Sequence, residues 1–256
     1  MEEKQENKKR SKKSLIIDIT LLVVSACLFL ATCVIFYQKV YLKTFYVNGQ
    51  SMWPTLNEFA TDSNGKTVGE NGGRSYAGYT VECGVYDSHK SSLKKIKRFD
   101  IVSTHYPGRE NEEFIKRVIG LPGDHIEFKT DVEHNGDLYI NGNYVEQPIK
   151  TEILRKGSYT TNNDITLKDN EYYVCGDNRG NSQDSRSIGP VTKEMLVGRV
   201  IAIIGTGKIT TDKDGNDYVK PSKIKYHRVR FMIWNKSIGI QATWKRPKSR
   251  FKTSLN

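Results

Sequence analysis

The sequence has few histidines and only four cysteines. It contains no Cys-x-x-Cys and no His-Glu-x-x-His, and its five histidines are scattered, so we expect neither a metal site nor a cofactor. Cys27 and Cys33 lie in an apolar run, which leaves Cys83 and Cys175. One possible pair does not establish a disulfide, so the sequence leaves the state of these two thiols open.

Acidic residues are missing from the end of the chain. The final 38 residues, Val219 to Asn256, carry 11 Lys/Arg and no Asp/Glu, while the remainder holds 29 basic and 29 acidic residues. The net charge of +11 therefore belongs to a basic C-terminal tail, residues 219–256. No nucleic-acid-binding module accompanies this charge, so we do not expect nucleic acid as a partner. Two interpretations remain, an anionic membrane lipid surface as the partner and a solvated end without one.

Long apolar runs are also absent, with one exception near the N-terminus. Residues 1–13 hold six Lys/Arg against three Glu, and the run from Leu15 to Tyr37 contains a single charge, Asp18. The 19 uncharged residues that end this run come close to the roughly 20 that cross a bilayer as a helix. A cleaved signal peptide is the alternative, but its apolar core is usually only about 7–15 residues long. We predict an uncleaved transmembrane helix over residues 15–37, with a cytoplasmic basic segment at 1–14 and all later residues extracytoplasmic.

Beyond residue 37 the sequence lacks long stretches of helical period. It has instead short β-prone runs divided by turn signals, at residues 47, 101–102, 114–119, 126–128, 172–174 and 200–204. Asn141-Gly142 predicts a two-residue hairpin turn between 138–140 and 143–145, and Asp214-Gly215 predicts a hairpin turn rather than a calcium loop. We therefore predict a mainly β domain over residues 38–218. Residues 58–79, rich in Gly, Asn, Ser and Thr, are predicted to form a surface insertion without chemistry.

A serine at the end of a predicted strand is the first candidate for chemistry. Gly49 lets the backbone approach a ligand closely and Pro54 stops the strand, so Ser51 lies at a fixed corner between strand and turn. The segment does not match the G-x-S-x-G of a nucleophile elbow. Taken alone, such a serine is more often a structural turn residue.

A lysine in the run 114–124 is the second candidate. Strand alternation places Phe114, Lys116 and Val118 on one face and Arg117 on the other. One of the two cations must then share a face with apolar neighbours. Because burial disfavours the charged amine and lowers its pKa, Lys116 can act as a general base for a serine hydroxyl. The simpler alternative is a strand with both cations at an exposed edge.

A dense polar loop, Gly176 to Arg186, is the third candidate. Its paired Asp and Arg residues are typical of a turn that is braced by charge, or of support beside an active site. Its length makes it more specific than the other two signals.

The three segments, in this order after an apolar run, resemble the bacterial type I signal peptidases. Ser51 to Thr55 is similar to the nucleophile box of that family, Phe99 to Val102 to a structural strand, Lys116 to Asp124 to the lysine box, and Gly176 to Arg186 to the Gly-Asp-Asn-Arg box. The resemblance covers residues 15–206 without the insertion, and residues 231–240 resemble the end of Gram-positive members. It implies a β-rich signal-peptidase-like catalytic domain behind a single N-terminal transmembrane helix.

The resemblance also implies roles for individual residues. Ser51 would be the acylating nucleophile and Lys116 its base, the Ser182 hydroxyl would orient the Lys116 amine, and Asp184 and Arg186 would pair behind it.

One position departs from the proteobacterial members of the family. They carry a hydroxyl residue two places before the nucleophile to help hold the oxyanion, and this chain has Gly49 there. The Ser51 backbone N–H is therefore the expected oxyanion donor, and a contribution from Gly49 is conjecture.

The resemblance implies a membrane-bound serine endopeptidase that removes N-terminal signal peptides from exported preproteins by way of an acyl-enzyme. It further implies small substrate residues at positions −1 and −3, and we expect a monomer in the cell membrane. One alternative is a catalytically inactive, membrane-tethered β domain that binds envelope partners. Another is a self-cleaving Ser/Lys protease of the repressor type, which the apolar anchor and the absence of a DNA-binding module disfavour.

Overall fold

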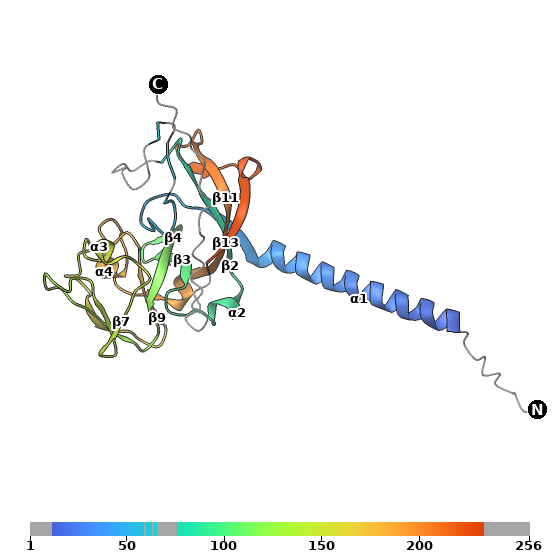
Figure 1. The fold of residues 1–256 in the computed structure, drawn as a ribbon, viewed down its shortest axis with the longest axis horizontal. Coiled ribbons are helices and arrows are strands. Elements are labelled where there is room, and N and C mark those ends of the chain that lie inside the picture. The colour runs from blue at the N-terminus through green and yellow to red at the C-terminus, as the bar shows by residue number, and fades with distance from the viewer. Residues whose placement is uncertain (1–11, 59, 63, 66–75, 233–256) are drawn as a thin grey trace, which may run out of the picture. The chain divides into compact units, whose positions relative to one another are not determined.

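The computed structural model describes residues 12–58, 60–62, 64–65 and 76–232, with the side chains of 12, 13, 227 and 228 left out of the description. The chain divides into two units between Leu42 and Lys43. The first consists of one helix, and the second is built mainly from strands (Figure 1). The prediction of a mainly β domain after one N-terminal apolar helix is therefore confirmed.

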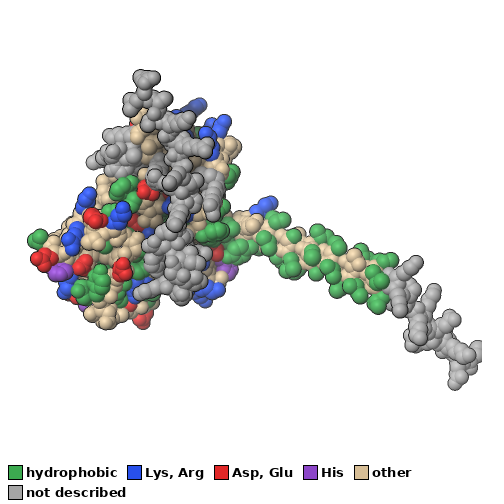
Figure 2. Space-filling model, viewed as in Figure 1, with side chains coloured by type: hydrophobic (Ala, Val, Ile, Leu, Met, Phe, Trp, Pro, Cys, Tyr) green, Lys and Arg blue, Asp and Glu red, His purple; other side chains and the backbone are tan. Residues whose placement is uncertain are grey.

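The helix α1 spans Lys12–Tyr41, 30 residues without Gly or Pro. Its apolar side chains cover the visible face from end to end (Figure 2), as in helices that lie in an apolar medium rather than against a core. Three of its hydroxyl groups, those of Thr20, Ser25 and Thr32, donate to carbonyl groups one turn back. It is the one described helix that is long and apolar enough to cross a membrane. It extends beyond the predicted 15–37, because nothing in the flanking residues breaks a helix.

The larger sheet has the strand order β1-β2-β11-β3-β4-β9-β10, and β12 and β13 also pair with β11. The pairings for which a register is described in this sheet are antiparallel. The strands are β1 (Leu42–Tyr46), β2 (Thr80–Asp87), β3 (Ile101–Tyr106), β4 (Arg109–Gly120), β9 (Glu171–Cys175), β10 (Val191–Thr192), β11 (Leu196–Thr211), β12 (Asp217–Val219) and β13 (Lys225–Phe231). The 16-residue β11 contacts four other strands, and irregularities in its register at several points accompany the bending that this requires.

The smaller sheet has the order β7-β6-β5-β8, with β5 at His125–Phe128, β6 at Leu138–Ile140, β7 at Asn143–Val145 and β8 at Asp164–Thr166. Its hairpin is the one predicted, since Ile140 pairs with Asn143. Asn141 and Gly142 supply the positive φ angles of 51° and 77° that a two-residue turn requires. The turn at Asp214-Gly215 likewise joins two paired strands, β11 and β12.

Short helical segments connect the strands. They are α2 (Lys90–Leu93), α3 (Thr151–Leu154), α4 (Ser185–Ile188), and the 3-10 segments η2 (Lys193–Met195) and η3 (Pro221–Lys223).

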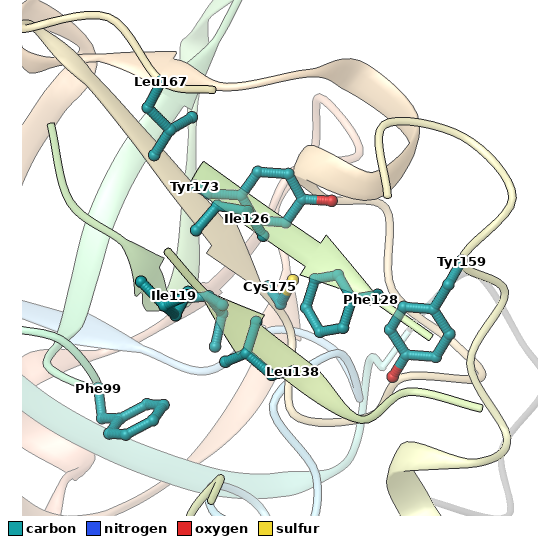
Figure 3. Close-up of a cluster of buried hydrophobic side chains, with 10 residues drawn as sticks. Phe99, Ile119, Ile126, Phe128, Leu138, Tyr159, Leu167, Tyr173 and Cys175 are labelled. Atoms are coloured by element: carbon teal, nitrogen blue, oxygen red, sulfur yellow. The ribbon is translucent and has the colours of Figure 1, made fainter. Parts of the chain in front are cut away.

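One of the core clusters lies where the smaller sheet packs on β4 and β9. Aromatic and aliphatic side chains from β5, β6 and β9 interlock there, with Tyr159 closing one side (Figure 3). Cys175 lies within this cluster, whereas Cys83 belongs to a different cluster on β2 and β11. Both thiols are free and buried, and burial raises the pKa of Cys83 to about 11 and that of Cys175 to about 12. The structure answers the question of a disulfide that the sequence left open, because neither thiol is paired and the two lie in different clusters.

The strand region is larger than the predicted boundaries of 38 and 218 suggested. β13 lies in the predicted tail. Its lysines and arginines are typical of a charged tail, so the charge pattern did not indicate a strand there. The described ends of the predicted insertion are also not loose, because Ala60, Tyr76 and Tyr79 are buried in the core. Residues 59, 63 and 66–75 of the insertion, residues 1–11 of the basic segment and residues 233–256 of the tail lie outside the described residues.

Candidate active site

The loop that follows β1 carries Ser51 and is anchored by its own apolar residues. Met52 and Leu56 are buried together with residues of β2, β3 and β11. Gly49, two residues before the serine, has a φ of 133°, a conformation that L side chains rarely adopt. The loop therefore turns sharply at Gly49 and presents Ser51, which is half-buried, at a fixed position.

Asn57 holds the two ends of this loop together. Its Nδ2 donates to the carbonyl oxygens of Val47 at 2.7 Å and Gly49 at 3.2 Å. Its Oδ1 accepts from the Glu82 backbone N–H at 2.8 Å. Asn57 is fully buried and has a φ of 60°, a conformation that asparagine tolerates better than most residues.

The tail strand β13 also supports the loop. Arg230 donates to the Thr55 carbonyl oxygen at 2.9 Å and to both carboxylate oxygens of Glu82 at 2.8 Å. A residue that the sequence placed in the basic tail thus positions the segment that carries Ser51.

The loop at 176–186 closes on Ser51 from the other side. The Asn178 backbone N–H donates to the Ser51 carbonyl oxygen at 3.0 Å, and the Asn178 Nδ2 donates to the Gln50 carbonyl oxygen at 3.2 Å. At Gly176, an added Cβ would collide with Ser182 Oγ and with the Ser51 carbonyl oxygen. Glycine is therefore required at Gly176 for the two loops to approach so closely.

Lys116 reaches Ser51 from β4. Its Nζ lies 2.8 Å from Ser51 Oγ and 3.1 Å from the Ile115 carbonyl oxygen. The residue is only 2% exposed, and its amine lies 5.8 Å from the centre of the Phe114 ring. Phe114 and Lys116 thus face the same side of the strand, as the alternation predicted.

Burial lowers the pKa of the Lys116 amine to about 8, against the attraction of the carboxylates of Asp184 and Asp177, which raises it. The Arg186 cation adds to the lowering. With this pKa, about a tenth of the molecules carry a neutral Lys116 at pH 7, against fewer than about one in a thousand for a lysine with the ordinary pKa of 10.5.

The neighbouring cation, Arg117, is also buried. It binds the Asp177 carboxylate with two hydrogen bonds, at 2.8 and 2.6 Å, and donates to the Phe99 carbonyl oxygen at 2.8 Å. The alternative of two cations at an exposed edge is wrong, because β4 pairs with β3 on one side and β9 on the other. Both cations therefore need partners inside the protein.

Asp184 and Arg186 form the second buried ion pair. Arg186 Nε and Nη2 lie 2.8 and 2.9 Å from the two carboxylate oxygens, and the Gly176 backbone N–H also donates to Asp184. Burial would raise the pKa of Asp184, but the hydrogen bonds and charge of Arg186 prevail and lower it. The pair is therefore ionised, and the carboxylate is already neutralised by its own partner.

Ser182 lines the same cleft as Lys116. Its Oγ is buried and has no hydrogen-bond partner of good geometry among the described residues, although it lies near enough to Asp184 to favour the ionised carboxylate. The structure thus brings Ser182 to the site without the contact to the amine that the resemblance implied.

The cleft at the site has a volume of about 340 Å³. Apart from the catalytic candidates and Gly49, its lining includes Asn48, Gln50, Phe114, Asn181, Gln183 and Tyr76. Tyr76 comes from the predicted insertion, where an aromatic residue near the end of a polar segment is only a weak signal for a place in the site. Among the described residues, no group of three or more His, Cys, Asp or Glu side chains could hold a metal ion.

Arg179 is another buried cation that the sequence did not distinguish. It is 2% exposed and donates to the Gly176 carbonyl oxygen, the Tyr159 hydroxyl and the Gln147 side-chain oxygen. These contacts tie the 176–186 loop to the core beneath the smaller sheet.

A serine hydroxyl beside a desolvated amine, on the wall of an open cleft, has the geometry needed for covalent catalysis by an enzyme with an amine as base. The chain matches the family described as signal peptidase, peptidase S26, over residues 17–204. A signal peptidase I of Bacillus amyloliquefaciens is 31% identical over 202 residues, which cover 76% of this chain and 91% of that protein. A signal peptidase I of Bacillus caldolyticus is 32% identical over 184 residues, covering 67% of this chain and 85% of that protein.

Among solved structures, a crystal structure of a signal peptidase I from Enterococcus faecalis matches with 32% identity and a TM-score of 0.34, covering 42% of this chain and 98% of that one. The extent of the family match establishes that the chain belongs to the S26 family of signal peptidases. It is accordingly a serine endopeptidase, and the resemblance seen in the sequence is confirmed.

Replacing Asn57 with glycine tests the support of the serine loop. Asn57→Gly keeps the positive φ but removes three side-chain hydrogen bonds, each worth about 1 kcal/mol. We expect the thermal unfolding midpoint of the full chain in detergent to fall by about 5–10 °C. The exposed Asn64→Gly serves as the matched control and should stay close to wild type. Equal midpoints for the two variants would show that Asn57 does not hold the loop.

Proposed function

We propose that this protein removes N-terminal signal peptides from preproteins, with Ser51 as nucleophile and neutral Lys116 as general base. The observation that carries the proposal is the 2.8 Å separation of Lys116 Nζ and Ser51 Oγ in a site where the lysine is 2% exposed. A lysine pKa of about 8 supports the role of base, because the amine must be unprotonated to accept the serine proton.

The reaction has two stages. In acylation, Ser51 Oγ attacks the scissile carbonyl carbon while Lys116 takes the hydroxyl proton. The tetrahedral intermediate then expels the amine of the mature protein, which receives that proton from Lys116, and an ester to Ser51 remains. In deacylation, Lys116 takes a proton from a water molecule that attacks the ester and returns it to Ser51 as the leader peptide departs.

The neutral amine has one lone pair and two N–H bonds. In this form one N–H would donate to the Ile115 carbonyl oxygen, 3.1 Å away, and the lone pair would accept from the Ser51 hydroxyl, 2.8 Å away. The second N–H is available for the Ser182 oxygen, which lines the same cleft and lacks a partner among the described residues. Ser182 would then orient the amine, and Asp184 paired with Arg186 would fix the loop that carries Ser182.

The substrate would bind in an extended conformation beside the strands at the cleft, with small side chains at −1 and −3, as in the family that this chain resembles. Ser51 follows Tyr37 by only 14 residues. A chain of that length spans at most about 50 Å, so the serine stays within that distance of the end of the apolar run.

This connection fits an enzyme that acts at the surface of the cell membrane. We propose that residues 15–37 form its single transmembrane segment, with residues 1–14 in the cytoplasm, where the excess of Lys and Arg favours them. The catalytic domain would be extracytoplasmic, the basic tail would contact membrane lipid, and the protein would act as a monomer. No metal or cofactor takes part in the proposed reaction.

Substitution of either member of the dyad tests the mechanism. We expect Ser51→Ala and Lys116→Ala to abolish cleavage of a preprotein by the full-length enzyme in detergent, because the first removes the nucleophile and the second the base. Lys116→Arg should be equally inactive, since a guanidinium stays charged at every relevant pH. Gel analysis of product formation measures all three variants.

The exposed Lys208 on β11 provides the control. Lys208→Ala should cleave at the wild-type rate, and all variants should retain near-UV circular dichroism. A Lys116→Ala enzyme as fast as wild type would refute the dyad, and a wild-type protein without activity would favour the tethered binding domain.

The dependence of activity on pH follows from the lowered lysine pKa. Only the neutral amine accepts a proton, so kcat/KM should rise through a midpoint near pH 8 and level off above it. Two pH units below the midpoint about 1% of the amine is neutral, so activity should fall about 100-fold there. The measurement uses a peptide whose own groups do not titrate in this range. A flat profile, or a midpoint near 10.5, would contradict a desolvated base.

A further inference from the structure

The oxyanion of the proposed tetrahedral intermediate needs hydrogen-bond donors. This chain lacks the hydroxyl side chain at position 49 that serves as one of them in the proteobacterial members of the family. The Ser51 backbone N–H makes no hydrogen bond to a described residue, so it is available as one donor. The backbone conformation at position 49, as well as the sequence, excludes a hydroxyl side chain there. Because the φ of Gly49 is 133°, any L residue there would be strained. A second side-chain donor must therefore come from another part of the chain.

Tyr76 is a hydroxyl residue whose ring lies beside Gly49. It lines the cleft together with Ser51 and Lys116. Its ring carbon Cε2, next to the carbon that bears the hydroxyl, is 4.0 Å from the point where a Cβ at Gly49 would be. The ring thus borders the space that a side chain at Gly49 would enter.

The Tyr76 ring is held firmly. It is 7% exposed and packs in the core cluster of β2 and β11. Its ring meets that of Tyr79 edge to face, with centroids 5.7 Å apart. A donor fixed in this way loses little entropy when it binds the oxyanion, which is the property that makes preorganised donors effective.

The hydroxyl of Tyr76 stays protonated. Burial raises its pKa above the ordinary value of 10.0, the neighbouring Tyr79 raises it further, and an interaction with the Gln50 backbone N–H opposes the rise. That interaction also places the hydroxyl beside the residue that precedes Ser51. Its oxygen can accept from Gln50 while its proton is directed to a substrate oxygen.

We propose that the Tyr76 hydroxyl is the second oxyanion donor of this enzyme, in place of the hydroxyl residue that position 49 cannot carry. The inference rests on the proposed function of Ser51 and Lys116. When Ser51 Oγ bonds to the scissile carbon, the carbonyl π electrons move to the oxygen, and the serine proton passes to Lys116. Tyr76 donates a hydrogen bond to that oxygen and transfers no proton. The bond weakens when the carbonyl forms again and the amine leaves.

The test compares Tyr76→Phe with wild type in the full-length enzyme in detergent. The variant removes only the hydroxyl and keeps the ring that packs in the core. Loss of one oxyanion donor lowers kcat by about 100-fold or more, so we expect a fall of that order with KM within about two-fold. The midpoint of the pH profile should stay in place, because Lys116 is untouched. A peptide boronate, whose adduct with serine carries the tetrahedral oxyanion, should lose affinity by a similar factor.

Tyr79→Phe is the matched control, because it removes a hydroxyl from the same cluster but from a residue outside the cleft lining. It should keep kcat within about two-fold of wild type. If Tyr76→Phe has wild-type kcat, or raises KM alone, Tyr76 is only a wall of the cleft and the inference falls. Equal losses of kcat in both phenylalanine variants would overturn it too. If wild type and Lys208→Ala both fail to cleave, the proposed function itself has failed, which is a distinct result.

Discussion

One constraint governs the residues around the cleft: the Lys116 amine must be kept out of water beside the Ser51 hydroxyl. Burial of Lys116 disfavours its charged form, but two carboxylates nearby, Asp184 and Asp177, would restore the charge if they had no other partner. Each of them instead binds an arginine with two hydrogen bonds, Arg186 and Arg117 respectively. The buried ion pairs therefore do more than hold loops together. They supply rigid polar support, and the Arg186 cation offsets part of the rise in the lysine pKa that the two carboxylates cause.

The order of motifs in the sequence was sufficient to predict the fold class. It was also sufficient to predict that Ser51, Lys116 and the 176–186 loop lie in one site. Strand alternation correctly placed Phe114 and Lys116 on a common face. The alternative of both cations at an exposed edge was wrong, because alternation alone does not distinguish an edge strand from one that is paired on both sides. The contacts of Asn57 and Arg230 were also beyond prediction. They join segments 25 and 148 residues apart, and a polar residue in a loop gives no sign of such distant partners.

The predicted insertion illustrates a different limit of sequence reasoning. Its composition of small polar residues is typical of a surface loop, and such loops are usually peripheral to catalysis. Yet Tyr76 and Tyr79 near its end are buried in the core, and Tyr76 reaches the cleft. Aromatic residues at the end of a polar segment are a weak signal for this behaviour, because burial depends on the partners that the fold provides. In this chain those partners are residues of β2, β11 and β12, such as Val81, Ile209 and Val219, which pack with the two tyrosines in one cluster.

The most direct measurement of the central claim is a titration of the Lys116 amine itself. Lysine labelled with ¹³C at the ε carbon gives an NMR signal whose shift follows the charge of each amine, and Lys116→Arg identifies the signal by its loss. We predict that this signal titrates near pH 8, well below the ordinary lysine value of 10.5. A Lys116 signal that titrates near 10.5 would contradict this prediction, since the amine would then be neutral in fewer than about one molecule in a thousand at pH 7 and could not serve as the base.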